Sequence, residues 1–324
     1  MRPILVIFLA LLLQAGSETP PLQVLARKHF APLPARMDAP GSQPQPAQIE
    51  LGRRLFYETQ LSINNTQSCN TCHDLRFYGQ DGRPTSPGAV RGRGKRNAPS
   101  VYTAAMHTAQ FWDGRSPSVE DQARFPILNE IEMGMPNEAL VEQRLRAIPE
   151  YRQLFARAFP QDKEPLRWER LLQAIGAFER GLLARAPFDR YLEGDVGALD
   201  DRQLRGLEHF LRLGCVRCHQ GPALGGDRLQ KIGQKRPFPC LDRGRAEATG
   251  KPEDEGVFKV PSLRNISETA PYYHDGQVRK LEEAVRLMGQ HELDVELTPQ
   301  QVMEICDFLL SLTGEIPTDY VKAP

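Results

Sequence analysis

Two copies of the pattern Cys-x-x-Cys-His constrain this chain more than any other feature, namely Cys69-Asn-Thr-Cys72-His73 and Cys215-Val-Arg-Cys218-His219. Two thiols one helical turn apart can form thioethers with both vinyl groups of a haem, and the adjacent histidine then ligates the iron. A thioredoxin-like thiol pair or a zinc ribbon is the alternative for either motif alone. Two copies, both followed by His in an exported chain, favour two covalently bound haem c groups.

The N-terminus predicts export to the periplasm. Arg2 is followed by the uncharged apolar run 4–13 and by small residues at 15–17, so residues 1–17 are typical of a cleaved signal peptide. An uncleaved membrane anchor is the alternative, although the run is short for a full membrane span. The mature protein is then expected where thiols can be oxidised.

Composition excludes several classes of protein. Lys and Arg number 41 against 41 Asp and Glu, which argues against a dedicated nucleic-acid binder. The 40% of hydrophobic residues is too much for a disordered chain, and no long apolar run follows residue 17. A soluble, folded chain of 324 residues is most naturally two domains.

Apolar residues recur at helical spacing through most of the chain, and no strand-like alternation of useful length is present. Thr298 is a suitable N-cap for the last helix, with Pro299 at N1, Gln301 completing a capping box and Gly314 closing the C-terminus. The sequence predicts an all-α fold of two cytochrome c-like haem domains with long loops at 79–96 and 221–252. The other expected helices span 137–159, 167–185, 201–213 and 280–288.

A weak internal repeat suggests the domain boundary. Gly52 and Phe56 precede the first haem motif much as Gly206 and Phe210 precede the second, and composition shifts near 187–199. The predicted organisation is a signal peptide at 1–17, an extended and exposed lead-in at 18–48, an N-terminal haem domain at 49–190 and a C-terminal haem domain at 191–324.

Two questions stay open at the level of the residues alone. Cys240 and Cys306 lie outside the haem motifs, and either a disulfide between them or a buried free thiol at Cys306 is consistent with the sequence. The sixth ligand of each iron is also undetermined, since a lone methionine or histidine is more often structural. The candidates are His29, His107, His209, His274, His291 and the methionines.

Several longer segments resemble the bacterial di-haem cytochrome c peroxidase family, which also contains the MauG-type enzymes. They follow the family's order across nearly the whole mature chain. The matching stretches are LGRRLFYETQLS (51–62), SCNTCHD (68–74), RNAPS (96–100), FWDGRSPSVEDQA (111–123), NEIEMG (129–134), PFDRYLEGD (187–195), GCVRCHQGPALGG (214–226), FKVPSLRNISETAPYYHDG (258–276) and LEEAVRLM (281–288).

The resemblance assigns the peroxidatic role to the haem at His73. The family's distal glutamine, proline and glutamate then correspond to Gln122, Pro126 and Glu132. A carboxylate above the iron can move a proton between the two peroxide oxygens, and an amide can orient the peroxide. Taken alone, Glu132 would be read as a solvated carboxylate.

The same resemblance makes the haem at His219 the high-potential site where electrons enter. Met288 corresponds to its axial methionine, whereas MauG carries a tyrosine there. Trp112 corresponds to the tryptophan between the two haems, where it assists electron transfer, and a buried core tryptophan is the structural alternative.

The resemblance also implies a calcium ion between the domains. Its ligands would be a side-chain oxygen of Asn97 and backbone carbonyls of Thr269 and Pro271, because oxygen donors suit Ca²⁺. Capping of a turn is the alternative role for Asn97.

One departure from the family pattern is informative. Some family peroxidases place a histidine after the first haem motif, where it ligates the peroxidatic iron until reduction releases it. Here the equivalent position is Ala89, and no histidine occurs from 74 to 106. The iron at His73 is therefore expected to be five-coordinate or water-ligated even when oxidised, a trait shared by constitutively active peroxidases and MauG.

The leading hypothesis is a periplasmic peroxidase that reduces hydrogen peroxide with electrons from a small cytochrome c or cupredoxin. One alternative is a MauG-like enzyme that oxidises aromatic residues of a partner protein, favoured by the open iron at His73 and disfavoured by Met288. The other is a non-enzymatic di-haem electron carrier, against which Glu132 and Gln122 argue. Dimerisation is usual for the family's peroxidases.

Overall fold

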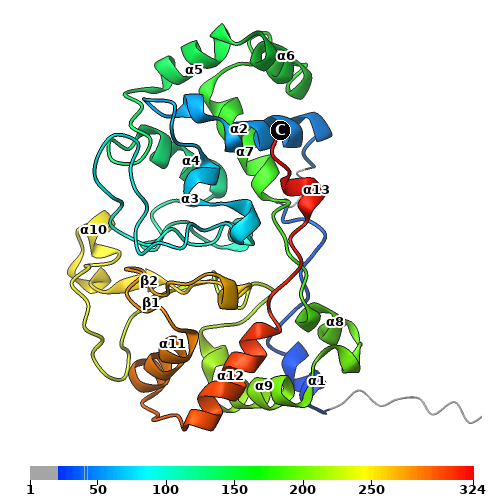
Figure 1. The fold of residues 1–324 in the computed structure, drawn as a ribbon, viewed down its shortest axis with the longest axis vertical. Coiled ribbons are helices and arrows are strands. Elements are labelled where there is room, and N and C mark those ends of the chain that lie inside the picture. The colour runs from blue at the N-terminus through cyan, green and yellow to red at the C-terminus, as the bar shows by residue number, and fades with distance from the viewer. Residues whose placement is uncertain (1–20, 40, 42) are drawn as a thin grey trace, which may run out of the picture.

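The computed structural model describes residues 21–39, 41 and 43–324. The predicted signal peptide at 1–17 lies outside the described residues. The chain forms two helical halves stacked along the long axis of an elongated molecule, with irregular loops and a small ribbon of strands between them (Figure 1). No helix among the described residues is long and apolar enough to cross a membrane.

The N-terminal half is built around the crossing of two helices. A Cβ atom added at Gly52 in α2 would lie 1.8 Å from the carbonyl oxygen of Ala174 in α7, so the two backbones touch. Phe56 packs against Phe178 across the same crossing, with ring centroids 5.5 Å apart. The helices of this half are α2 (Pro46–Tyr57), α3 (Cys69–Cys72), α4 (Val119–Leu128), α5 (Glu138–Ala147), α6 (Pro149–Ala158) and α7 (Trp168–Glu179).

The C-terminal half repeats this crossing. A Cβ at Gly206 in α9 would lie 1.8 Å from the carbonyl oxygen of Glu304 in α12, and the ring centroids of Phe210 and Phe308 are 5.2 Å apart. The Gly-x-x-x-Phe repeat of the sequence therefore marks the same close helix pair in both halves. The helices here are α1 (Pro21–Arg27), α8 (Pro187–Glu193), α9 (Asp201–Leu213), α11 (Leu281–Met288) and α12 (Pro299–Leu310).

Helices dominate the described residues, with one small addition to the expected all-α fold. Strands β1 (Leu229–Lys231) and β2 (Val257–Lys259) pair antiparallel, near the short helix α10 (Ala246–Thr249). Three-residue strands are too short to show a period of two in the sequence, so the pattern analysis missed them.

Several predicted helix ends were wrong. Pro149 splits the expected helix at 137–159 into α5 and α6, because proline starts a helix but cannot continue one. The helix expected at 167–185 ends at Glu179. Thr298 caps α12 as predicted, but α12 ends at Leu310, and Gly314 instead donates its N–H to Asn265 Oδ1 at 2.9 Å.

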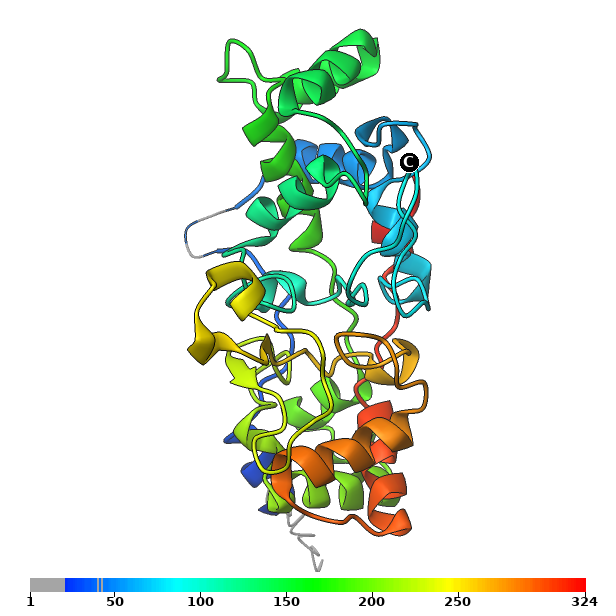
Figure 2. The same cartoon turned by 90° about the vertical axis from the view of Figure 1, so that its left-hand side faces the viewer.

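Three segments run between the halves along one side of the molecule (Figures 1 and 2). The first is the predicted lead-in, which is largely extended after α1 but is not exposed as expected: Phe30, Leu33 and Met37 are all buried. Its apolar side chains are separated by Pro and Arg, so the composition of the segment did not indicate that they are buried. The last segment leads to α13 (Thr318–Val321), whose Val321 packs into the N-terminal half.

Candidate active site

The first haem motif presents His73 in the form that a metal requires. Cys69–Cys72 form a single helical turn, and His73 Nδ1 lies 3.2 Å from the carbonyl oxygen of Gly79. An Nδ1–H donated to this carbonyl leaves Nε2 as the free lone pair. Burial lowers the pKa of His73, which keeps the ring neutral and able to ligate.

The second motif repeats this arrangement with a different local backbone. His219 Nδ1 lies 3.1 Å from the carbonyl oxygen of Leu224, and the preceding turn is a 3-10 helix over Cys215–Arg217. Burial lowers the pKa of His219 to about 4. Both histidines are thus held by a carbonyl five or six residues downstream, which fits proximal haem ligands.

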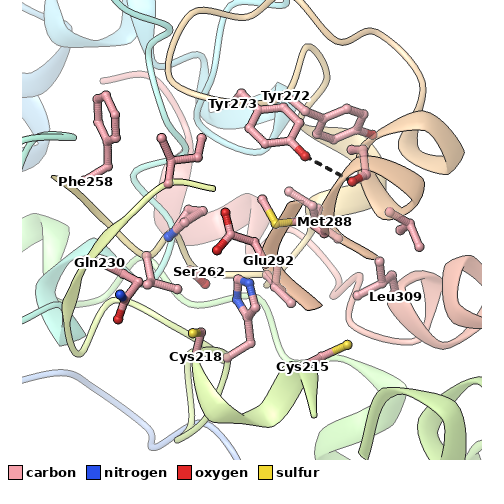
Figure 3. Close-up of a pocket in the computed structure, with 18 of the residues that line it drawn as sticks. Cys215, Cys218, Gln230, Phe258, Ser262, Tyr272, Tyr273, Met288, Glu292 and Leu309 are labelled. Atoms are coloured by element: carbon pink, nitrogen blue, oxygen red, sulfur yellow. Dashed lines mark hydrogen bonds between the residues drawn. The ribbon is translucent and has the colours of Figure 1, made fainter. Parts of the chain in front are cut away.

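A cavity of about 440 Å³ opens above the second motif. Its lining includes His219, Met288 and Leu309. Figure 3 shows Cys215 and Cys218 on one side of this space and the sulfur of Met288 on the other. Met288 is the last residue of α11, directly before a turn of π-helix at Gly289–Leu293. The apolar lining, the two thiols, and the imidazole and thioether that line the same cavity fit a haem with His and Met ligands.

Lys259 and His107 line the same cavity. The sequence analysis named His107 only as one candidate for a sixth iron ligand, and it did not single out Lys259. Lys259 is only 6% exposed, and its Nζ lies 2.8 Å from His107 Nδ1. His107 Nε2 is buried without a hydrogen-bond partner among the described residues. Burial lowers the pKa of Lys259 to about 7. A buried cation beside an unpartnered ring nitrogen fits the carboxylate of a haem propionate. The sequence feature that could have pointed to Lys259 is a lysine inside the apolar stretch Val257-Phe258-Lys259-Val260.

The proposed distal residues of the first haem come from one helix and the turn after it. Gln122 and Pro126 are four residues apart, and therefore lie on one face of α4. Glu132 follows in a turn closed by its own N–H, which donates to the Asn129 carbonyl at 3.1 Å. Asn129 Nδ2 also donates to Glu132 Oε1 at 3.3 Å. The side-chain amide thus helps to position the carboxylate.

The charge of Glu132 acts on the haem motif that contains His73. Burial raises the pKa of Cys72 to about 11, and the charge of Glu132 contributes to the increase. Burial also raises the pKa of Glu132 itself, against the opposing effect of Arg115. The Arg115 guanidinium stacks 3.4 Å from the Phe111 ring centroid and donates to Asp113 Oδ2 at 2.8 Å. Arg115 is a further residue that the sequence analysis did not single out.

The loop that carries a histidine in some family members here supports the Glu132 turn. Ala89 N–H donates to the carbonyl of Glu132 at 2.7 Å. A Cβ at Gly88 would lie 1.7 Å from the carbonyl oxygen of Ile131, so the two backbones are in contact. Gln67 Nε2 donates to the Pro87 carbonyl at 3.2 Å. The loop is thus fixed against the distal turn by backbone contacts.

Trp112 connects the two halves. Its Nε1–H donates to the Asn97 carbonyl at 2.9 Å, and its own carbonyl accepts the N–H of Lys259 at 2.6 Å. It also lines the cavity above the second motif. This position suits a side chain through which electrons pass between the halves.

Asn97, Thr269 and Pro271 all line that cavity. Asn97 is 8% exposed, and its Nδ2 donates to the Arg83 carbonyl at 2.9 Å, which leaves the side-chain oxygen available to a cation. Within the described residues no group of three or more His, Cys, Asp or Glu side chains could hold a metal ion. A calcium site here would depend on amide and carbonyl oxygens.

Cys240 and Cys306 are not joined by a disulfide in the described part of the chain. Cys306 is buried in the C-terminal core, whereas Cys240 lies in the loop after β1 beside His274.

Comparison with known proteins gives consistent matches over both halves. A family profile described as di-haem cytochrome c peroxidase matches residues 46–197. Cytochrome c551 peroxidase of Pseudomonas aeruginosa is 42% identical over 295 residues, covering 89% of this chain and 85% of that protein. Methylamine utilization protein MauG of Methylorubrum extorquens is 36% identical over 266 residues, covering 79% and 74%. The crystal structure of a MauG-like protein associated with microbial copper homeostasis has a TM-score of 0.81 at 30% identity, covering 90% and 97%.

Proposed function

Because the chain belongs to the di-haem cytochrome c peroxidase family, we propose that it reduces hydrogen peroxide at the His73 side and receives electrons at the His219 side. The activity itself, a cytochrome c peroxidase, follows from 42% identity to a cytochrome c551 peroxidase over most of both chains. The observation that supports this division of roles is the contrast between the two sides. A half-buried carboxylate, Glu132, accompanies the first motif, and a thioether, Met288, lines the cavity above the second.

Each motif would hold one haem c. Cys69 and Cys72 would form thioethers to the first, and Cys215 and Cys218 to the second, with His73 and His219 as the proximal ligands. When bound, the haem supplies the iron that binds peroxide and exchanges electrons. The neutral, carbonyl-oriented imidazoles and the cavity above His219 support this assignment.

Glu132 is the proposed proton carrier. Reduction of H₂O₂ to two waters consumes two electrons and two protons, and cleavage of the O–O bond requires a proton on the departing oxygen. The carboxylate of Glu132 can accept a proton from one peroxide oxygen and deliver it to the other. Its raised pKa moves it closer to the working pH than an ordinary glutamate. Gln122 would orient the peroxide by hydrogen bonding, and Pro126 would form the wall between them.

Electrons would reach this side through Trp112. Its hydrogen bond to Asn97 and the contact of its carbonyl with Lys259 fix the indole between the two halves. Met288 as the sixth ligand at His219 would raise the potential of the receiving haem, which suits electron entry from a carrier protein. Cytochrome c and a cupredoxin are the two proposed kinds of donor.

Calcium would bind between the halves through the Asn97 side-chain oxygen and the carbonyls of Thr269 and Pro271. The shared position of these residues at the cavity supports the site, and their oxygen donors suit Ca²⁺. Dialysis against a chelator should lower peroxidase turnover and shift the haem spectrum, and added Ca²⁺ should restore both. Unchanged turnover in protein shown to be calcium-free would contradict the site.

Export to the periplasm with removal of residues 1–17, and association into a homodimer, complete the proposal. Mass spectrometry of the mature chain and sedimentation of the purified protein test these two points separately.

A MauG-like activity is the second candidate, supported by the absence of a histidine from 74 to 106. It would direct the same oxidising power to aromatic residues of a partner protein. Met288 in place of the tyrosine that MauG carries argues for the peroxidase.

The deciding test is steady-state oxidation of reduced cytochrome c by H₂O₂, using fully oxidised protein as isolated. Prompt turnover is expected, because no loop histidine blocks the first iron. If half-reduced protein and a cupredoxin donor also give no turnover while both haems are intact, the peroxidase proposal is wrong.

A further inference from the structure

Cys240 is a free thiol held against a buried imidazole. Its Sγ lies 3.2 Å from His274 Nε2 and 3.3 Å from the carbonyl oxygen of Asp242. The neighbouring Leu241 is fully exposed, so the thiol sits just below the surface. Neither haem motif uses Cys240, and the proposed peroxidase reaction gives it no role.

His274 links this thiol to Trp112. The imidazole is 3% exposed, stacks on Phe258 with ring centroids 4.2 Å apart, and meets the Trp112 indole edge-on at 6.4 Å. The backbones are joined as well, since Asn97 N–H donates to the His274 carbonyl at 2.8 Å and the Asn97 carbonyl accepts the Trp112 indole N–H. Sulfur, imidazole and indole therefore form a continuous series of contacts from the surface to the region between the halves.

We propose that Cys240 is an oxidation site that gives electrons to Trp112 when peroxide is present and no external donor is available. This inference rests on the proposed role of Trp112 as the electron path. Its consequence is that surplus oxidising equivalents end on one defined cysteine near the surface.

The first step is a coupled transfer of one electron and one proton. An electron passes from the Cys240 sulfur to the Trp112 indole that has lost one, while the S–H bond breaks and its proton forms a bond to His274 Nε2. The products are a neutral indole, a thiyl radical and an imidazolium. A second oxidising equivalent and one water then convert the thiyl to sulfenic acid with release of a proton. The sum is R–SH + H₂O₂ → R–SOH + H₂O.

Direct attack of Cys240 on peroxide is the competing route. It requires a thiolate, and burial raises the pKa of the Cys240 thiol. The transfer through Trp112 needs only the neutral thiol and an unprotonated His274 Nε2, which lies 3.2 Å from the sulfur. The two routes differ in whether Trp112 is required.

The test adds one equivalent of H₂O₂ to the oxidised di-haem protein without donor and traps sulfenic acid with dimedone. Mass spectrometry compares labelling at Cys240 with labelling at Cys306, the internal control that is buried in the C-terminal core. Cys240 should be labelled and Cys306 should not. Reduced cytochrome c present in excess should suppress the labelling.

Two variants separate the routes. Trp112→Phe should lower Cys240 labelling about tenfold or more, because direct attack by a neutral thiol is slow. His274→Phe keeps an aromatic ring but removes the proton acceptor, and should also lower labelling. Labelling is compared only for variants whose absorption spectra show that both haems are retained.

Equal labelling in Trp112→Phe and the parent protein would overturn the proposal in favour of direct attack. Absence of Cys240 labelling in a protein that oxidises cytochrome c would overturn it and leave the peroxidase function intact. Failure of the peroxidase function would appear instead as absent cytochrome c oxidation. Cys240→Ser should retain donor-dependent turnover while losing the label.

Discussion

The two halves share a scaffold and differ in the side chains proposed to act beside each haem motif. In both, a glycine allows two helices to touch, a phenylalanine four residues later packs across them, and the motif histidine is held by a downstream carbonyl. The N-terminal half then adds the half-buried carboxylate of Glu132, and the C-terminal half adds the thioether of Met288. In the proposed roles, one scaffold serves both peroxide chemistry and electron entry, and these few side chains make the difference.

The largest effect is expected from removing Glu132, the proposed proton carrier of the N-terminal half. Glu132→Gln keeps the shape of the side chain but cannot accept a proton, so the rate of peroxide cleavage should fall by about 10²–10⁴. Stopped-flow measurement of the peroxide reaction tests this, with retention of both haems as the control. Turnover at the parental rate would remove Glu132 from the mechanism.

The pH profile should report the same group. In its proposed role Glu132 acts as a base, so the deprotonated form is active and the rate should fall about tenfold per pH unit below its pKa. Burial raises that pKa above its ordinary value, which moves the fall to higher pH. The fall in rate at low pH should disappear in Glu132→Gln. A fall that persists in this variant would belong to another titrating group.

Met288→Ala would make the C-terminal half resemble the N-terminal half. The low-spin His/Met signature should be lost at one haem, and the midpoint potential of that haem should fall. Near-infrared absorption and a spectroelectrochemical titration measure both. A persistent His/Met signature would identify another methionine as the ligand.

The shared scaffold can be tested by matched substitutions. Gly52→Ala and Gly206→Ala each place a Cβ 1.8 Å from a backbone carbonyl, so the helices must separate. Each should lower the free energy of unfolding by about 1–3 kcal/mol. Chemical denaturation compares the two. A tolerated alanine in one half alone would show that the two crossings are not equivalent.

The smallest effect is expected at Lys259, which lines the cavity of the C-terminal half. Lys259→Met removes a buried positive charge beside the cavity above His219, which should lower the midpoint potential of that haem and leave the potential at His73 almost unchanged. Potentiometric titration measures the midpoint potentials of the two haems separately. Equal shifts at both haems would point to a general structural change.

The sequence by itself determined the local chemistry. The two haem motifs, the helical periodicity, the cap at Thr298 and the Gly-x-x-x-Phe repeat are set by neighbouring residues and can be read without a structure. Glu132, Met288 and Trp112 were found only through the family resemblance, because a single carboxylate, thioether or indole carries no pattern of its own.

Tertiary structure alone decided which distant residues meet. The pair of Lys259 with His107 spans 152 positions and that of Cys240 with His274 spans 34, and no local rule links such residues. The burial of the lead-in was decided in the same way, since Phe30 and Met37 are covered by segments far along the chain. Local patterns specify helices and ligands, whereas the environment of a charge or a thiol depends on packing between remote parts of the chain.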